Sequence, residues 1–134
     1  MRVESGMFGT IDIAVSGLRA TNRQIEVTGS NIANIQTTDA GNGQPYRRLI
    51  AEFKAAKDGM GVEVAKIAGD TSDFNRVLNP GHPAADAEGY VSMPNVDWPT
   101  EMVTLNLASR AYQANAAILK RYQKMVETSL ELLR

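Results

Sequence analysis

Residues 97–134 read DWPTEMVTLNLASRAYQANAAILKRYQKMVETSLELLR, and no proline or glycine follows Pro99. Asp97 is a suitable helix cap, Pro99 fits a first turn, and Glu101 favours the positive end of a helix dipole. Apolar side chains recur every seven residues at Leu105, Tyr112, Leu119, Val126 and Leu133. This period is typical of coiled coils, so the stretch predicts one long, apolar-striped helix.

The N-terminal part of the chain carries a matching pattern. A helix is predicted from about Thr10 to Ala33, because an apolar stripe with seven-residue spacing runs through Ile11, Leu18, Ile25 and Ile32. Gly17 and Gly29 weaken this helix but permit another helix to approach its backbone closely. We therefore expect the two terminal helices to pack as an antiparallel coiled-coil pair, with the first stripe against the second, within one subunit or between subunits.

The middle of the chain has a different pattern. Alternating residues predict a β-hairpin made of strands 46–53 and 62–67, joined by a turn at 58–61. Residues 79–99 contain four of the five prolines, so we expect an extended proline-rich loop with at most a short strand at 90–93.

These patterns predict a mainly α fold built as one structural unit rather than as separate domains. It divides into an N-terminal helix and signature (1–38), a hairpin and loop spacer (39–97) and a C-terminal coiled-coil helix (98–134). The spacer is too small to cover both helices, and uncovered apolar surface usually marks an interaction site. We therefore expect this chain to assemble with copies or relatives of itself, and to show weak helicity as a dilute monomer.

Composition excludes several classes of protein. The chain has 134 residues, a formal net charge of −1, one histidine and no cysteine. Disulfide frameworks, thiol nucleophiles and multi-histidine metal clusters are thereby ruled out. The balanced charge gives no bulk attraction to nucleic acid. No stretch is apolar enough to span a bilayer, and no signal-peptide pattern is present, so we expect no direct membrane insertion and no cleaved signal.

Chemical sites in the sequence are weak, and we expect neither catalysis nor a cofactor or metal. His82 lies between prolines, where a local hydrogen bond is the expected role of its ring. Asp86 and Glu88 fit turn-capping carboxylates better than a cation site. Arg47 and Arg48 form a basic pair that is expected to be solvated or paired with acidic neighbours.

Two motifs, one at the end of the N-terminal helix and one within the C-terminal helix, resemble those of a known family. Residues 30–38 (SNIANIQTT) and 109–115 (SRAYQAN) resemble the N- and C-terminal signatures of the flagellar axial proteins, the rod and hook subunits. Residues 45–48 (PYRR), 79–83 (NPGHP) and 86–96 (DAEGYVSMPNV) resemble segments of the proximal rod subunits within that family.

The resemblance implies a structural role in the flagellar basal body. Many subunits would stack helically with other rod proteins into the proximal rod, which crosses the periplasm and transmits motor torque to hook and filament for swimming motility. It also implies export without a cleaved signal through transient contact with the flagellar type III apparatus. Phe74 and Leu78 resemble a short export-gate motif, although an aromatic and an aliphatic at this spacing are also typical of a core pair.

The resemblance also marks signature residues, namely Ser30, Asn31, Ala33, Asn34, Ser109, Arg110, Tyr112 and Asn115. We expect Asn31 and Asn34 to satisfy backbone groups where the first helix ends, with solvent-exposed amides as the alternative. Tyr112 fits either assembly or packing within the monomer. Two other classes of function stay open at this point: a coiled-coil adaptor that binds one partner without polymerising, and a small hydrolase built on Asp86 and Glu88.

Overall fold

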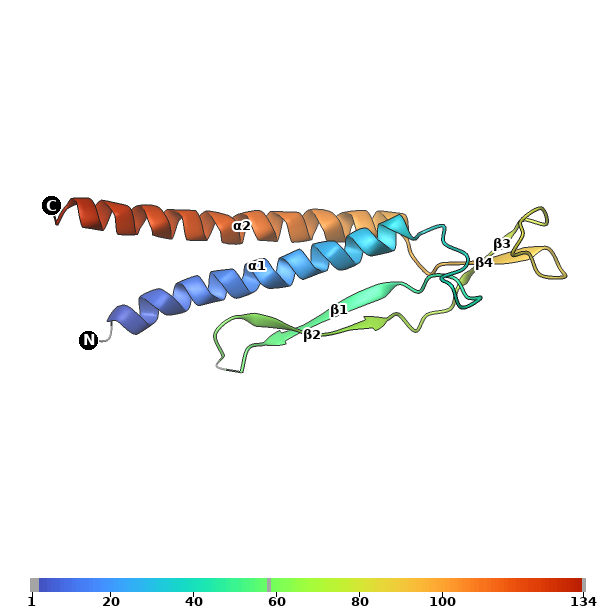
Figure 1. Cartoon of the computed structure of the whole chain (residues 1–134), viewed down its shortest axis with the longest axis horizontal. Helices are drawn as coiled ribbons and strands as arrows, with labels where there is room; N and C mark the ends of the chain where they lie inside the picture. The colour runs from blue at the N-terminus through green and yellow to red at the C-terminus, as the bar shows by residue number, and fades with distance from the viewer. Residues whose placement is uncertain (1–2, 58, 134) are drawn as a thin grey trace.

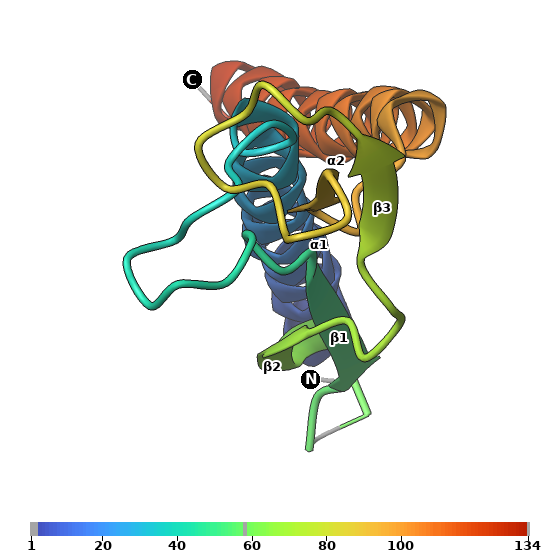
Figure 2. The same ribbon diagram turned by 90° about the vertical axis from the view of Figure 1, so that its right-hand side faces the viewer.

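Two long helices lie side by side along the molecule. The computed structural model describes residues 3–57 and 59–133, with side chains from residue 9 onward. Helix α1 spans Val3–Ala33 and helix α2 spans Trp98–Glu131. The start of α1 and the end of α2 lie at the same end of the molecule, so the helices are antiparallel (Figure 1). They are closest where α1 ends and α2 begins, and they diverge toward the termini (Figures 1 and 2).

The start of α2 is fixed by the residues that the sequence marked. Asp97 is the N-cap, and its Oδ2 accepts a 3.1 Å hydrogen bond from the backbone N–H of Thr100. The Thr100 hydroxyl also donates to Asp97, and together these bonds lower the pKa of that carboxyl. Pro99 and Glu101 occupy the first turn. The predicted start of this helix is therefore confirmed together with its cause.

Helix α1 begins earlier than predicted. It starts at Val3 rather than near Thr10, so the helix runs through Gly6 and Gly9 despite their low propensity. Gly9 is buried, and a Cβ at that position would lie 3.4 Å from the Met60 Sδ atom. Contact with the hairpin turn thus supports helical residues that lie before the apolar stripe begins.

The predicted hairpin is present, with shifted bounds. Strand β1 (Leu49–Ala55) pairs antiparallel with β2 (Val62–Gly69). The sequence predicted a first strand at 46–53, which is wrong at both ends. Tyr46 and Arg47 are held elsewhere, because the Tyr46 hydroxyl donates to Asn31 and an Arg47 guanidinium N–H donates to the Asp70 carbonyl. The pairing instead extends to Ala55 opposite Val62, past an irregularity in register between Glu52 and Phe53.

The hairpin turn presses against α1. Gly61 has φ of +103°, and a Cβ there would lie 2.3 Å from the Ser16 Oγ atom. That hydroxyl accepts a 3.1 Å hydrogen bond from the backbone N–H of Val62. Glycine is therefore required at residue 61 both by the backbone conformation and by the close approach to α1.

A second, smaller hairpin lies at the far end of the molecule. Strand β3 (Asn75–Leu78) pairs with β4 (Tyr90–Met93), and residues 79–89 connect them. The strand at 90–93 was predicted and β3 was missed. Every residue of β3 is exposed, so the strand has no alternation of buried and exposed positions from which to recognise it. Arg76 stabilises the pair from outside, since it pairs with Asp86 and lies over the Tyr90 ring.

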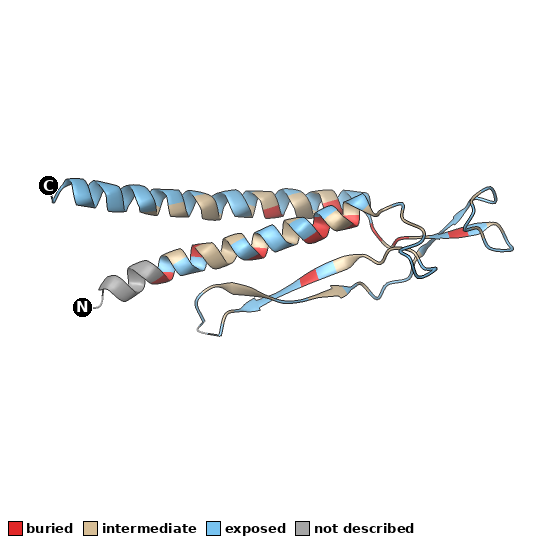
Figure 3. Cartoon of the chain, viewed as in Figure 1, coloured by how far each residue is buried: buried red, intermediate tan, exposed pale blue. Residues whose placement is uncertain are grey.

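The buried core is thin. Its apolar members are mostly small: Ala14, Ala20, Val27, Ala51, Val91, Val96 and Ala108. Buried positions occur along α1 and in the first part of α2, whereas the terminal part of α2 is exposed (Figure 3). The small side chains let backbones approach one another, and among the residues that the structure describes the C-terminal part of α2 stays exposed.

Candidate assembly surface

A polar junction, formed by Asn31, Arg48, Glu101 and the backbone of Leu49, joins α1, β1 and α2. Glu101 is 1% exposed, and its two carboxylate oxygens accept hydrogen bonds from Arg48 Nε at 2.6 Å and from Asn31 Nδ2 at 3.1 Å. Asn31, also 1% exposed, donates to the Leu49 carbonyl at 2.9 Å and accepts from the Leu49 N–H at 2.8 Å. One buried amide and one buried carboxylate thus tie three elements together.

Acidic partners keep Arg48 charged in this junction. Burial opposes the charge, but the hydrogen bonds and the attraction of Glu101 and Asp70 outweigh it, so the pKa of Arg48 is raised. Asp70 lies 3.3 Å from Arg48, and its own pKa is lowered by hydrogen bonds from the backbone and side chain of Ser72 and then by Arg48. Asn95 adds a bond from the other side, since its Oδ1 accepts the Arg48 backbone N–H at 2.8 Å.

The sequence patterns singled out these residues but did not predict that they contact one another. Glu101 was predicted only as a helix-start residue, and Arg48 as one of a solvated or locally paired basic pair. Fifty-three positions separate them, so no local pattern could reveal their contact. Asn31 was expected to serve backbone groups at the end of α1. Asn31 instead hydrogen-bonds to the backbone of Leu49 in β1, while Asn34 donates to the Ser30 carbonyl in the last turn of α1.

A glycine lies at a close contact between the two helices. A Cβ at Gly17 of α1 would lie 2.7 Å from the Asn115 Nδ2 atom of α2. That amide donates to the Ala111 carbonyl of its own helix at 3.1 Å, so its side chain lies flat along α2. Gly17 therefore allows the close approach that its sequence position indicated.

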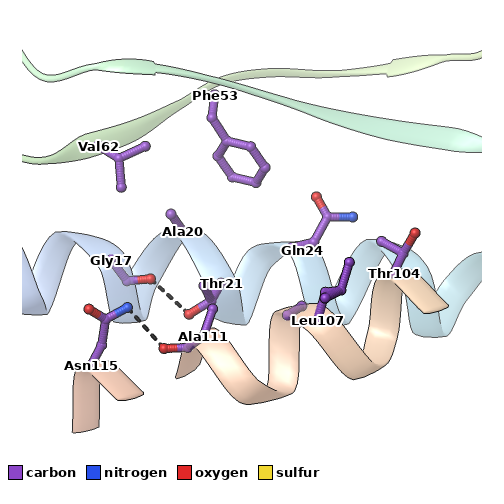
Figure 4. A pocket seen from close by; sticks show the side chains of 11 residues that line it. Gly17, Ala20, Thr21, Gln24, Phe53, Val62, Thr104, Leu107, Ala111 and Asn115 are labelled. Carbon is purple, nitrogen blue, oxygen red and sulfur yellow. Dashed lines mark hydrogen bonds between the residues drawn. The ribbon is translucent and has the colours of Figure 1, made fainter. Parts of the chain in front are cut away.

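An apolar groove opens beside this contact, between the two helices and the first hairpin (Figure 4). Its volume is about 500 Å³, and apolar atoms make up nearly all of its wall. The floor consists of small residues of both helices, and Phe53 and Val62 of the hairpin face it across the gap in Figure 4. The lining residues are Gly17, Ala20, Thr21, Gln24, Phe53, Val62, Thr104, Leu107, Ala108, Ala111 and Asn115. A groove of this shape suits bulky apolar side chains from another helix.

The apolar surface continues along α2 beyond the groove. Among the large side chains exposed on this helix, four share one face at helical spacing: Val103 at 60%, Leu107 at 62%, Ile118 at 44% and Met125 at 50%. Near its end Leu130 and Leu132 are 64% and 83% exposed. Of the described residues, none packs over this run, which makes it a large apolar face on a small chain.

Apart from Leu133, the residues of the two predicted stripes are neither fully buried nor highly exposed. Six are half-buried: Ile11, Leu18, Ile25, Ile32, Leu105 and Leu119. Tyr112 is 39% exposed and Val126 is 37% exposed. The positions that are fully buried on α1 include Ala14, Ala20 and Val27, which lie beside the predicted stripe rather than within it.

The remaining signature residues divide between the junction and the surface. The Ser30 hydroxyl lies 3.1 Å from that of Tyr46, which in turn bonds Asn31. Ser109 is half-buried, whereas Ala33 and Arg110 are exposed. Asn31 and Asn115 are thus the two signature residues that make the contacts between elements described above.

Phe74 and Leu78 lie outside both helices. Phe74 is half-buried beneath the Arg47 guanidinium, whose central carbon is 4.2 Å from the ring centroid. Leu78 ends β3 and is 60% exposed. They do not form a helical i, i+4 pair, and Leu78 is available to contact another molecule.

The weak chemical sites have local structural roles. The His82 Nδ1 atom accepts the backbone N–H of Ala84, and Asp86 accepts those of Glu88 and Tyr90. Within the described ranges there is no group of three or more His, Asp or Glu residues placed to hold a metal ion. No described helix is long and apolar enough to cross a membrane.

Two family models match terminal parts of the chain. A family model described as "Flagella basal body rod protein" matches residues 11–40, and one described as "Flagellar basal body rod FlgEFG protein C-terminal" matches residues 87–132. The flagellar basal-body rod protein FlgC of Yersinia enterocolitica is 42% identical over 130 residues, which cover 94% of this chain and 97% of the relative.

FlgC proteins of two other bacteria are also similar to this chain. FlgC of Bacillus subtilis is 36% identical over 93% of this chain and 97% of the relative, and FlgC of Borreliella burgdorferi is 34% identical over 96% and 99%. Matches of this identity and coverage show that the chain belongs to the family of the flagellar basal-body rod protein FlgC.

Proposed function

We propose that this chain is a structural subunit of the proximal rod of the bacterial flagellum. It assembles helically with copies of itself and with other rod subunits, and the assembly transmits motor torque to hook and filament. Family membership supports this role, and one structural observation carries it: the apolar face of α2 and the adjoining groove lie uncovered in the isolated chain. A protein that works by packing needs this surface rather than an active site.

The mechanical role follows from close packing. Two long helices of 31 and 34 residues give each subunit a stiff body of roughly 50 Å. Burying the α2 face against the groove of a neighbour would give an interface between different surfaces, which generates a helical filament when its rotation does not close into a ring. Protein interiors are packed as densely as organic crystals and resist deformation, so such a wall transmits torque.

Substitution of Leu107 tests the assembly surface. Leu107 is 62% exposed, so Leu107→Asp leaves the fold of the monomer intact while placing a charge at the edge of the groove. The matched control is Gln113→Asp, an exposed position on the same helix. With each variant as the sole copy in its bacterium, we expect Leu107→Asp to abolish swimming and to leave basal bodies without a complete rod. The control should swim normally.

Two measurements make the result decisive. Circular dichroism of the purified variants at low protein concentration must show equal helicity, so that loss of motility reports assembly rather than unfolding. Electron micrographs of basal bodies then show whether rods form. Full swimming with intact rods in Leu107→Asp would overturn the assigned surface. Complete rods in cells that lack this chain would overturn the role as a rod subunit and favour an adaptor that does not polymerise.

Location and export form the finer part of the proposal. The chain reaches the periplasmic rod without a cleaved signal by transient contact with the flagellar type III export apparatus, and Phe74 and Leu78 contribute to its recognition. Leu78 offers the cleaner test, because Phe74 also stacks beneath Arg47. We expect Leu78→Ala to reduce the amount of exported chain, and its exposed neighbour Val77→Ala to leave export unchanged. Equal export of both variants would contradict the motif.

A further inference from the structure

The loop between α1 and β1 contains the chain's single Asn-Gly sequence, at Asn42 and Gly43. This loop projects away from both helices, as Figure 2 shows for the teal segment. Asn42 and its neighbours in the loop are exposed, and Gly43 has φ of +73°. A glycine here has no Cβ to shield its backbone nitrogen, and it adopts this conformation without strain.

Hydrogen bonds place reactive groups around Asn42. The Gly43 backbone N–H donates to the Asp39 Oδ1 atom at 2.9 Å, and the Gly41 N–H donates to the same oxygen at 2.8 Å. On the other side, the Asn42 Oδ1 atom accepts the Gln44 backbone N–H at 3.1 Å. A carboxylate therefore contacts the nitrogen that follows Asn42, while an N–H group polarises the Asn42 side-chain carbonyl.

We propose that Asn42 is a site of self-modification, at which the Gly43 nitrogen attacks the Asn42 side-chain carbonyl carbon and the asparagine is converted to aspartate and isoaspartate. In the first step a bond forms between the Gly43 nitrogen and Asn42 Cγ, the bond from Cγ to Nδ2 breaks, and ammonia leaves. The product is a five-membered succinimide. Water then opens either carbonyl of this imide, which gives aspartate or isoaspartate at residue 42.

Asp39 and Gln44 each have a role in the first step. The Gly43 nitrogen must lose its proton as it attacks, and Asp39 Oδ1 is within the distance at which a positioned base accepts a proton. That proton then leaves with the ammonia. Negative charge develops on Asn42 Oδ1, where the Gln44 N–H acts as a preorganised donor. The backbone N–H groups of Gly41 and Gly43 lower the pKa of Asp39, so its carboxylate is ionised at neutral pH.

The product changes the loop. Either form adds one negative charge near Asp39, and the isoaspartate form inserts an extra methylene into the backbone. The loop is closed by a 2.8 Å bond from the Ala40 N–H to the Gln44 carbonyl, and a longer backbone would disturb this closure. The modification therefore alters the charge and shape of a projecting loop without touching the polar junction or the groove.

The experiment follows the full chain in neutral buffer over time. Peptide mass spectrometry measures the mass change that replaces the side-chain amide with a carboxyl, and an isoaspartyl methyltransferase reports the isoaspartate. Asn22 is the internal comparison, because it is exposed but precedes Arg23 within α1. We expect conversion at Asn42 to exceed that at Asn22, and to disappear in Asn42→Gln. Equal conversion at the two asparagines would overturn the proposal.

Asp39→Ala tests whether conversion depends on the position of the Asp39 carboxylate or only on the Asn42-Gly43 sequence. The variant changes only the exposed loop, and circular dichroism verifies that the helices are retained. We expect conversion to fall roughly tenfold, a modest part of what a positioned base can contribute. Conversion in the folded wild-type chain should also exceed that in the same chain unfolded in urea. An unchanged or faster rate in Asp39→Ala, or a rate in urea equal to that of the folded chain, would overturn the role of the loop geometry.

Discussion

Asn115 on α2 lies so close to Gly17 on α1 that a Cβ at residue 17 would come within 2.7 Å of its Nδ2 atom and 3.0 Å of its Cγ atom. Contacts this short do not occur for real Cβ atoms, so any side chain at residue 17 must displace the amide. Displacement would cost the Asn115 bond to the Ala111 carbonyl. A side chain at residue 17 therefore requires the end of the Asn115 side chain to move from its position on α2.

Gly17→Ala tests this contact. Alanine gains up to about 1 kcal/mol of helix propensity over glycine, whereas forcing an extra methyl into a packed contact costs about 1–3 kcal/mol. We expect a net loss in the free energy of unfolding, measured by urea denaturation. Gly29→Ala is the matched control on the same helix, because a Cβ at residue 29 would meet nothing within 4 Å. It should stabilise the chain by about 1 kcal/mol.

The same contact predicts coupling between its two residues. In an Asn115→Ala background the obstructing amide is absent, so Gly17→Ala should become neutral or stabilising. A double-mutant cycle then gives an interaction energy of about 1 kcal/mol or more. Additive effects of the two substitutions would show that the helices are further apart than the structure has them.

Glu101→Gln tests the polar junction. The new amide would present one N–H group to either Arg48 or Asn31, both of which are donors toward Glu101. Breaking a buried ion pair typically costs 3–5 kcal/mol, and because Arg48 retains some solvent contact we expect about 3 kcal/mol. Urea denaturation measures the loss. Glu127→Gln, an exposed carboxylate on the same helix, should change stability by less than about 0.5 kcal/mol.

Replacing the whole pair separates charge from packing. In Arg48→Met with Glu101→Leu the buried carboxylate is removed together with Arg48, and Asp70, which loses Arg48, keeps its hydrogen bonds from Ser72, so stability should recover relative to Glu101→Gln. The double variant also removes a partner of Asn31, which keeps its two bonds to the Leu49 backbone. Stability below that of Glu101→Gln would show that Glu101 contributes through hydrogen bonding to Asn31 rather than through Arg48.

The parts of the fold that follow from local patterns could be predicted from the sequence. The cap at Asp97, the two long helices, the first hairpin and the strand at 90–93 all follow from the identity and spacing of nearby residues. Strand β3 has no such pattern, because its residues are all exposed and it depends on pairing with β4. Burial gives a strand its alternation, and without burial the sequence carries no signal.

The sequence predicted that apolar helix surface would be uncovered, but it did not predict which residues form that surface. Uncovered apolar helix surface was expected from the small size of the spacer, and the exposed side chains of Leu107 and Met125 now locate it. The junction between Arg48 and Glu101 could not be predicted, since it depends on how the chain returns from the hairpins to α2. Asn31 was singled out by its motif, and only the structure shows that its amide hydrogen-bonds to the backbone of β1.

Stability should fall in acid through hydrogen-bonded aspartates, of which Asp97 lies at the start of α2 and Asp70 lies beside the polar junction. The pKa of Asp97 is lowered by the hydroxyl and backbone N–H of Thr100, and that of Asp70 by Ser72 and Arg48. The folded state thus holds these protons less tightly than the unfolded state. Their stabilisation is present above the ordinary pKa near 3.8 and is lost as pH falls through the lower folded values.

Thermal melts at a series of pH values measure this loss. The melting temperature should decline from about pH 5 downward. Asp97→Asn retains a cap but cannot titrate, so its melting temperature should depend less steeply on pH. Asp73→Asn, an exposed aspartate outside both hydrogen-bonded sets, provides the comparison and should follow the wild-type slope. If the melting temperature depended equally steeply on pH in wild type and in Asp97→Asn, the Asp97 carboxylate would have no part in the loss of stability in acid.

Helicity should depend on protein concentration, because tertiary packing supplies most of a helix's stability and residues 123–133 are exposed in the isolated chain. At low concentration we expect weak helicity and rapid amide exchange in this segment, with slower exchange around the junction at Asn31 and at Ala108. Circular dichroism and hydrogen exchange at rising concentration should show increasing helicity. Leu107→Asp, which blocks the proposed contact, should remain at the dilute value throughout. A fully helical wild-type chain that melts cooperatively at the same temperature at every concentration would show that α2 needs no neighbour to fold.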